Sequence, residues 1–169
     1  MFCVVLLKKV YLGNSLETIG NYAFAQCQKL TSIDIPDSVT SVGNGVFNGC
    51  PSLSSIHFPD TVTDLGYDVI EGSRYYHDLP DGLIYLGKCA YKYKGNMPEN
   101  TEINITPDTT SIGISAFIYC YGLKSITIPD SVQRINQRAF SWDTNLETVD
   151  SLRNVEVIDN EAFSHCNSL

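Results

Sequence analysis

The chain has 169 residues, of which 43% are apolar, and its 19 acidic and 11 basic side chains give a formal net charge of −8. This balance argues against nucleic-acid binding, which normally needs a basic face, and it disfavours adsorption to anionic lipid. No apolar run approaches the roughly 18 residues that a transmembrane helix needs.

The sequence from Ile19 to Gly66 repeats itself at a fixed offset of about 23 residues, a period typical of solenoid proteins. The first copy places small, aromatic and aliphatic residues at set positions, and the second copy matches each of them: Ile19-Gly20 with Val42-Gly43, Ala23-Phe24 with Val46-Phe47, Cys27 with Cys50, Leu30 with Leu53, Ile33 with Ile56, and Ile35-Pro36-Asp37 with Phe58-Pro59-Asp60. A repeat array has no single closed core, so the length of this chain indicates the number of coils and not the number of domains.

The opening segment, residues 1–9, resembles a signal peptide only faintly. Lys8 and Lys9 follow the apolar run instead of preceding it, and no small-residue cleavage site appears. The repeat register extends back to this segment, because Leu7, Val10 and Leu12 lie one full repeat before Leu30, Ile33 and Ile35. We interpret the N-terminus as the tail of a coil, and we expect any export signal to lie outside this chain.

Each coil begins with a short alternating segment such as Leu30–Ile35. Leu30, Ile33 and Ile35 are apolar and Ser32 and Asp34 are polar, which is the pattern of a half-buried strand. The proline that follows ends the strand, because proline has no amide hydrogen to donate to a sheet. A glycine then supplies a bend, and the Ala-Phe step suits a short helical turn on the other side of the coil.

The period breaks after Ile70. The segment 71–101 keeps none of the repeat positions, and it carries two β-rich runs, Leu83–Leu86 and Cys89–Lys94, on either side of Gly87-Lys88. This pattern predicts a hairpin inserted between coils. The register resumes at Ile103 and loosens in the last coil, where Asp143 takes a cysteine position, Ser151 an inward strand position and Leu152 the proline position.

We therefore predict one continuous solenoid domain: repeats over 1–70 with a partial first coil, an inserted hairpin-containing segment over 71–101, and repeats over 102–169 with an incomplete last coil. Its short strands form one side of each coil, and turns and short helical turns form the other side.

Four of the six cysteines, Cys27, Cys50, Cys120 and Cys166, occupy one repeat position. A disulfide framework rarely keeps such a period, whereas a small buried residue facing the solenoid interior does. We expect buried free thiols. Stacked coils lie about 4.8 Å apart, so distance alone leaves a Cys27–Cys50 bridge open.

These motifs resemble the BspA-like class of leucine-rich repeats. The resemblance is based on the pattern Leu123-x-x-Ile126-x-Ile128-Pro129-x-x-Val132-x-x-Ile135-x-x-x-Ala139-Phe140, with a cysteine three residues after the phenylalanine in most copies. The segment from Leu79-Pro80-Asp81-Gly82 to Ala90-Tyr91-Lys92-Tyr93-Lys94-Gly95 also looks like one found between repeats in bacterial members.

The resemblance implies a curved solenoid with a parallel sheet of short strands on its concave side. It also implies a surface-exposed or secreted protein that adheres to host matrix and plasma proteins or to other cells. It implies no catalytic residues and no cofactor.

The first candidate binding surface is the outward side of the predicted sheet, which we call the sheet face. Its polar residues are Ser32, Asp34, Ser55, His57, Glu102, Asn104, Ser125, Thr127, Thr148 and Asp150, preceded by Lys9 and Tyr11. Such a ladder could bind an extended protein partner through many polar contacts. The alternative is a solvated face whose short side chains only permit curvature.

The second candidate is an aromatic column formed by Tyr119, Trp142 and His165, which follow one another at the repeat spacing and each precede the cysteine position. Aromatic side chains are favoured as binding anchors. The alternative is that these rings pack on each other or on a further coil.

The third candidate is the hairpin region, which combines aromatic and basic residues: Tyr75, Tyr76, Tyr85, Tyr91, Tyr93, Lys88, Lys92 and Lys94. It could hold an anionic ligand or a protein. The alternative is that the tyrosines cover an irregular flank of the solenoid while the lysines protect an exposed strand edge.

Catalysis is not expected. His57, His77 and His165 show no metal-ligand spacing, and the sequence has no nucleophile elbow, phosphate-binding glycine loop or zinc-protease motif. The sequence thus favours a non-enzymatic, protein-binding module with no metal, located at the cell surface or outside the cell. The alternative function is a structural spacer that displays other domains.

Overall fold

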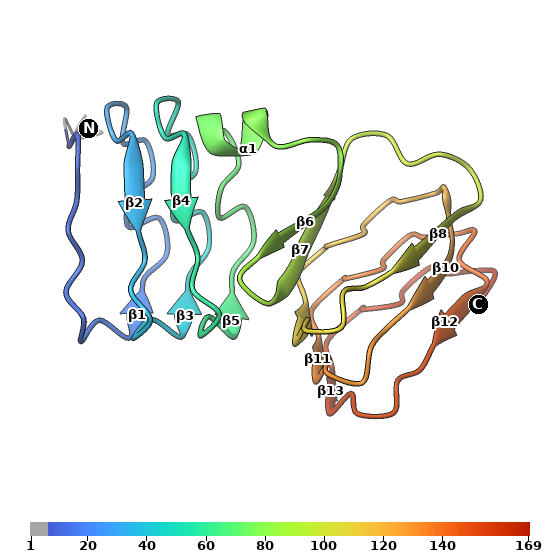
Figure 1. Ribbon diagram of the computed structural model, residues 1–169. Coiled ribbons are helices and arrows are strands. Elements are labelled where there is room, and N and C mark those ends of the chain that lie inside the picture. Colours follow the sequence, from blue (N-terminus) through green and yellow to red (C-terminus); the bar gives the residue numbers. More distant parts are fainter. Residues whose placement is uncertain (1–6) are drawn as a thin grey trace. The chain divides into compact units, whose positions relative to one another are not determined.

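A computed structural model describes residues 7–169 as a β-solenoid of about six turns with a spacing of about 23 residues (Figure 1). The chain divides into two compact units, residues 1–79 and 80–169, and each is described by itself. The predicted repeat solenoid with parallel sheets is confirmed. The prediction of one continuous domain stays a prediction.

The first sheet of unit 1 contains β2 (Ser32–Asp34) and β4 (Ser55–His57), which pair in parallel. Ile33 lies opposite Ile56, at the spacing that the repeat predicts. Lys9 forms an isolated parallel bridge with Ser32. This bridge confirms that the described part of the N-terminal segment is already in the repeat register.

Unit 1 has a second parallel sheet that the sequence analysis did not identify. It consists of β1 (Thr18–Ile19), β3 (Ser41–Val42) and β5 (Asp64–Leu65), in the order β1-β3-β5. Its inward residues Ile19, Val42 and Leu65 are buried. Figure 1 shows these strands as a separate row from β2 and β4.

The Ala-Phe step forms consecutive hydrogen-bonded turns in place of a regular helix. The N–H of Ala25 donates to the carbonyl of Tyr22 within the turn, and the N–H of Phe24 donates to the carbonyl of Val46 in the next coil at 3.0 Å. Each turn thus makes part of its backbone hydrogen bonds with the neighbouring coil. These bonds link adjacent coils at the turns, in addition to the two sheets.

A short helix, α1 (Arg74–Asp78), follows β5 and was not predicted. Ser73 caps it, because its Oγ accepts a hydrogen bond from the N–H of Tyr76 at 3.0 Å. The N–H of Tyr75 donates to the carbonyl of Leu53. The helix therefore stacks on the preceding coil even though the sequence period has stopped.

Unit 2 repeats this arrangement. Its first sheet has the order β12-β10-β8, formed by β8 (Thr101–Asn104), β10 (Leu123–Thr127) and β12 (Thr148–Asp150). Its second sheet has the order β13-β11-β9-β7-β6 and contains β9 (Ser111–Ile112), β11 (Arg134–Ile135) and β13 (Val157–Ile158).

The predicted hairpin is present as β6 (Gly82–Leu86) and β7 (Cys89–Lys94), which pair antiparallel. The hairpin is also part of the solenoid, because β7 pairs in parallel with β9, with Cys89 opposite Ser111 and Ala90 opposite Ile112. These partners are closer in the chain than one full repeat. The shortened step hides the continuity of the second sheet from a search for a fixed period.

The core of each unit is built from the same inward positions. Phe47, Phe117 and Phe140 have no exposed surface, and Phe117 stacks on Phe140 with ring centroids 5.1 Å apart. Hydroxyl and amide side chains add hydrogen bonds from one coil to the carbonyls of the coil before it: Ser38 to Leu16, Thr61 to Val39, Ser131 to Thr109, Asn154 to Asp130, Ser52 to Gln28 and Ser168 to Thr144.

Phe47→Ala should lower the free energy of unfolding by about 3–5 kcal/mol, because it leaves a cavity between two coils. Phe163 holds the same repeat position in the last coil, where its ring is only half-buried. The matched variant Phe163→Ala should therefore lower the free energy of unfolding by less. Chemical denaturation at low protein concentration measures both. Equal losses would contradict the stacking of coils as the source of this burial.

Candidate functional site

The structure places the ten sheet-face residues on the outward side of five strands, with eight of them exposed and Ser32 and Ser125 half-buried. They form two ladders, one in each unit. In unit 1, Asp34 lies opposite His57 on β2 and β4. In unit 2, Thr127 lies between Asn104 on β8 and Asp150 on β12. Tyr11, which precedes the unit 1 ladder, is 82% exposed, and the amine of Lys9 lies 4.9 Å from its ring centroid.

The ladders differ in charge. The unit 1 ladder has one carboxylate, Asp34, beside the ionisable His57. The unit 2 ladder carries Glu102 and Asp150 on its two outer strands, with serine and threonine hydroxyls between them. The outward residues of the unit 2 ladder therefore fit a partner with basic or hydrogen-bond-donating groups.

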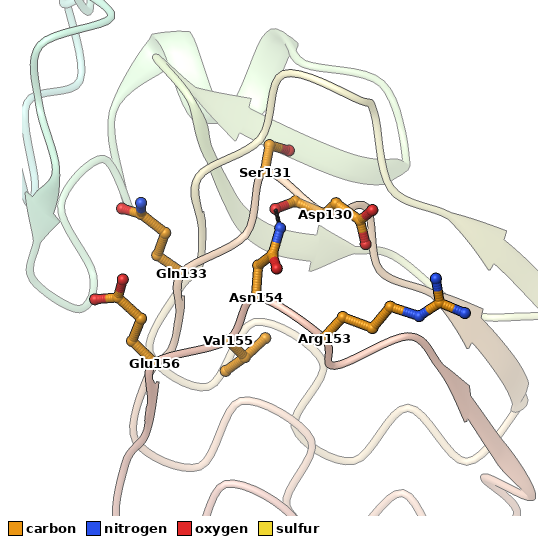
Figure 2. A pocket seen from close by; sticks show the side chains of 7 residues that line it. All are labelled: Asp130, Ser131, Gln133, Arg153, Asn154, Val155 and Glu156. Atoms are coloured by element: carbon orange, nitrogen blue, oxygen red, sulfur yellow. Dashed lines mark hydrogen bonds between the residues drawn. The ribbon is translucent and has the colours of Figure 1, made fainter.

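Two open hollows border these sheets in unit 2. One is lined by polar side chains from the turns after β10 and β12, and Figure 2 shows its residues: Asp130, Ser131, Gln133, Arg153, Asn154, Val155 and Glu156. The Nδ2 of Asn154 donates to the carbonyl of Asp130 at 2.9 Å. The other is lined by Glu99, Asn100, Gly122, Lys124, Asn145, Glu147 and Ser168. Small-molecule sites are mostly apolar and enclosing, so these linings suit the rim of a protein contact better.

The aromatic column is a stack in the structure. The rings of Trp142 and His165 lie 3.9 Å apart at 21°, and those of Tyr119 and Trp142 lie 6.3 Å apart at 38°. Tyr121 extends the stack at 6.2 Å from Tyr119. The rings pack on each other, as the alternative interpretation holds, yet Tyr119 is 54% and Trp142 41% exposed. The column thus presents ring edges to solvent.

The backbone of the column has a feature that the sequence analysis missed. Tyr119, Trp142 and His165 have φ values of 62°, 69° and 63°, in the left-handed region that costs non-glycine residues energy. Gly49 and Gly72 occupy the same repeat position in unit 1, with φ values of 67° and 70°. The left-handed conformation thus recurs at this position in both units, and Gln26 in unit 1 adopts it without glycine (φ 60°), as the bulky side chains of unit 2 do.

The aromatic residues of the hairpin region are divided between the two units. Tyr75 and Tyr76 belong to α1 in unit 1, whereas Tyr85, Tyr91 and Tyr93 belong to the hairpin in unit 2. Tyr91 is only 3% exposed, and Tyr85 and Tyr93 are half-buried. The burial of the three hairpin tyrosines favours the covering role.

The cysteine position faces inward in both units, with Cys27, Cys50 and Cys120 buried and Cys166 half-buried. Cys27, Cys50, Cys120 and Cys166 are all free thiols, as is Cys89 outside the column. The Sγ of Cys50 donates to the carbonyl of Phe24, and burial raises the pKa of this thiol to about 11. The prediction of buried free thiols is confirmed for Cys27, Cys50 and Cys120, whereas Cys166 is free but half-buried.

Asp143 stands in this column between Cys120 and Cys166 and has no exposed surface. Its Oδ1 accepts a hydrogen bond from the N–H of Cys120 at 2.8 Å, and its Oδ2 has no hydrogen-bond partner within residues 7–169. Burial raises the pKa of this carboxyl to about 8. The side chain is therefore mostly protonated and neutral at pH 7, as its apolar surroundings require.

The described part of the chain holds no group of three or more His, Cys, Asp or Glu side chains placed to bind a metal ion. No helix within residues 7–169 is long and apolar enough to cross a membrane.

The fold and these surfaces define a leucine-rich repeat solenoid. A family model described as the BspA type leucine-rich repeat region, in six copies, matches residues 1–97 and 75–169. The chain belongs to this family. No curated protein sequence matches the chain.

One solved structure shares the fold, and a second is similar in sequence. A leucine-rich cell surface protein from Faecalibacterium prausnitzii is 24% identical with a TM-score of 0.54, over 94% of this chain and 45% of its own. A leucine-rich repeat protein from Bacteroides ovatus is 23% identical with a TM-score of 0.43, over 94% of this chain and 40% of its own. The chain thus spans less than half the length of both proteins.

The buried carboxyl makes stability depend on pH. The folded protein holds the proton of Asp143 up to about pH 8, whereas the unfolded chain releases it near the ordinary value of 3.8. The free energy of unfolding is therefore highest, as far as Asp143 is concerned, below pH 3.8. It decreases by up to about 1.4 kcal/mol per pH unit as the pH rises from 3.8 towards 8.

The variant Asp143→Cys restores the residue of the other coils and should be more stable than the parent, by a margin that grows between pH 5 and pH 8. Denaturation of both proteins across this range measures the difference. A margin that does not change with pH would contradict a neutral buried carboxyl.

Proposed function

We propose that this chain is a non-enzymatic protein-binding module of a cell-surface or secreted protein, and that it adheres to host matrix or plasma proteins or to other cells. The observation that supports this most is the ladder of unit 2, where outward polar side chains from β8, β10 and β12 lie at fixed spacing on paired strands.

The ladder suits recognition of an extended polypeptide for energetic reasons. Its strands are held by hydrogen bonds on an apolar core, with Ile126 fully buried beneath it, so the backbone has little freedom left to lose on binding. Its short side chains also have few rotamers to fix. The charges of Glu102 and Asp150 would favour a basic segment of the partner and would speed its encounter.

The competing function is a structural spacer that displays other domains and has no ligand of its own. The same rigid stack of coils serves this role equally well. The two functions differ in one respect, because a spacer tolerates any substitution of outward residues whereas a binding module does not.

The test is saturable binding of the purified chain to immobilised fibronectin, fibrinogen and other matrix and plasma proteins. Two variants address the ladders separately: Asp34→Ala with His57→Ala in unit 1, and Glu102→Ala, Thr127→Ala and Asp150→Ala in unit 2. The matched control replaces exposed residues next to or on the second sheet: Thr18→Ala, Thr63→Ala and Arg134→Ala.

We expect at least tenfold weaker binding for one ladder variant, about 1.4 kcal/mol, with unchanged thermal stability and an unaffected control. Binding that survives in both ladder variants but is lost in Trp142→Ala would transfer the site to the aromatic column. A folded chain that binds nothing on the panel would favour the spacer.

A further inference from the structure

We propose that Cys27 and Cys50 form a disulfide between neighbouring coils of unit 1 when the protein is in an oxidising environment. The structure shows both residues as free thiols, which is the reduced form of this pair. The proposal rests on the location at the cell surface or outside the cell that is part of the proposed function, because disulfides persist in oxidising compartments. It concerns the interior of the coils and not the sheet face.

The two cysteines occupy the same repeat position of successive coils. The backbone beside them holds this register, because the N–H of Gln26 donates to the carbonyl of Asn48 in the next coil at 2.8 Å. Stacked coils lie about 4.8 Å apart, and disulfides join residues whose Cα atoms are about 4.4–6.8 Å apart. The repeat register therefore meets the distance requirement of a disulfide.

The side chain of Cys50 also points towards Cys27. Its Sγ donates a hydrogen bond to the carbonyl of Phe24 at 3.0 Å, and the same carbonyl accepts a bond from the N–H of Cys27 at 3.4 Å. The two thiols are in contact as well: burial raises the pKa of the Cys27 thiol, and a hydrogen bond with the Cys50 thiol lowers it in part. The two sulfur atoms are thus neighbours inside the coils.

Unit 2 keeps this arrangement but has an acid in place of one cysteine. The Sγ of Cys166 donates to the carbonyl of Phe140 at 3.0 Å, and this carbonyl also accepts from the N–H of Asp143 at 3.2 Å. Asp143 therefore stands where Cys27 stands in unit 1. Cys120 and Cys166 are two coils apart, roughly twice the spacing of about 4.8 Å, and a bridge beyond about 7 Å needs backbone movement.

Formation of the bridge is a two-electron oxidation. Both S–H bonds break and one S–S bond forms. The two protons and two electrons pass to a small-molecule disulfide such as glutathione disulfide, which becomes two molecules of thiol. The exchange proceeds through a mixed disulfide of the protein and the small molecule.

Burial determines when this reaction takes place. Cys27 is 1% exposed and Cys50 has no exposed surface, so an oxidant does not reach either sulfur in the closed coils. Burial also raises the pKa of the Cys50 thiol to about 11, which leaves little of the reactive thiolate at neutral pH. We therefore expect the bridge to form while the coils assemble and to be protected from reductants afterwards.

The test is refolding of the reduced full chain in a buffer of glutathione and glutathione disulfide, followed by alkylation of free thiols and tryptic mapping by mass spectrometry. Cys27 lies in the tryptic peptide 10–29 and Cys50 in the peptide 30–74. We expect these two peptides to be joined with the loss of two hydrogen atoms, while Cys120 and Cys166 are alkylated. Separately alkylated Cys27 and Cys50, or bridges that join the cysteines at random, would overturn the proposal.

The variant Asp143→Cys places a thiol beside those of unit 2 in the geometry of unit 1. It should gain a second bridge, from position 143 to Cys166 or Cys120, its neighbours in the column. The matched control Asp143→Ser should gain none. If Asp143→Cys gains no bridge, the repeat register is not what brings thiols together, and the proposal fails.

A bridge that fits the stacked coils should also stabilise them. The oxidised parent should unfold at a higher temperature than the reduced parent, and this difference should be absent in Cys50→Ser, whose folding circular dichroism confirms. An oxidised parent that unfolds at a lower temperature would show that the bridge distorts the coils and would overturn the proposal. No binding partner takes part in these measurements, so their failure is distinguishable from a failure of the sheet face to bind a protein.

Discussion

The structure depends on one constraint: each coil must satisfy its backbone through the coils beside it. Thr40 and Gly43 donate to carbonyls of the coil before them, while Phe24 and Gln26 donate to carbonyls of the coil after them. A single coil therefore has neither a core nor a complete set of hydrogen bonds. The repeat register is the spacing that meets both needs at once, and every side chain is thereby placed next to its own repeat equivalents.

This placement explains which substitutions the array accepts. Inward positions meet copies of themselves, so phenylalanine stacks on phenylalanine and cysteine follows cysteine. Asp143 breaks such a column and has to give up its charge, because the neighbouring thiols of Cys120 and Cys166 offer no cation. Outward positions have no such restriction, so the aromatic column could replace the glycines of unit 1 at only a local backbone cost.

The sequence alone predicted what repeats at a fixed distance: the first sheet, its inward and outward residues, the cysteine column and the register of the aromatic column. It also predicted the hairpin from its own composition. It missed the second sheet, because a strand as short as Ser41–Val42 carries too few residues for an alternating pattern. It missed the left-handed positions, since side chains as different as Gln26, Trp142 and His165 adopt them. The shortened step at Cys89 hid the hairpin's place in the second sheet.

The sheet face illustrates a different limit. Repeat spacing assigns Asp34 and Thr127 to one kind of surface, but the hairpin segment lies between them in the chain, and the two ladders belong to separate units. A period specifies how neighbouring coils align and carries no information across an interruption. Each ladder is therefore a separate candidate surface.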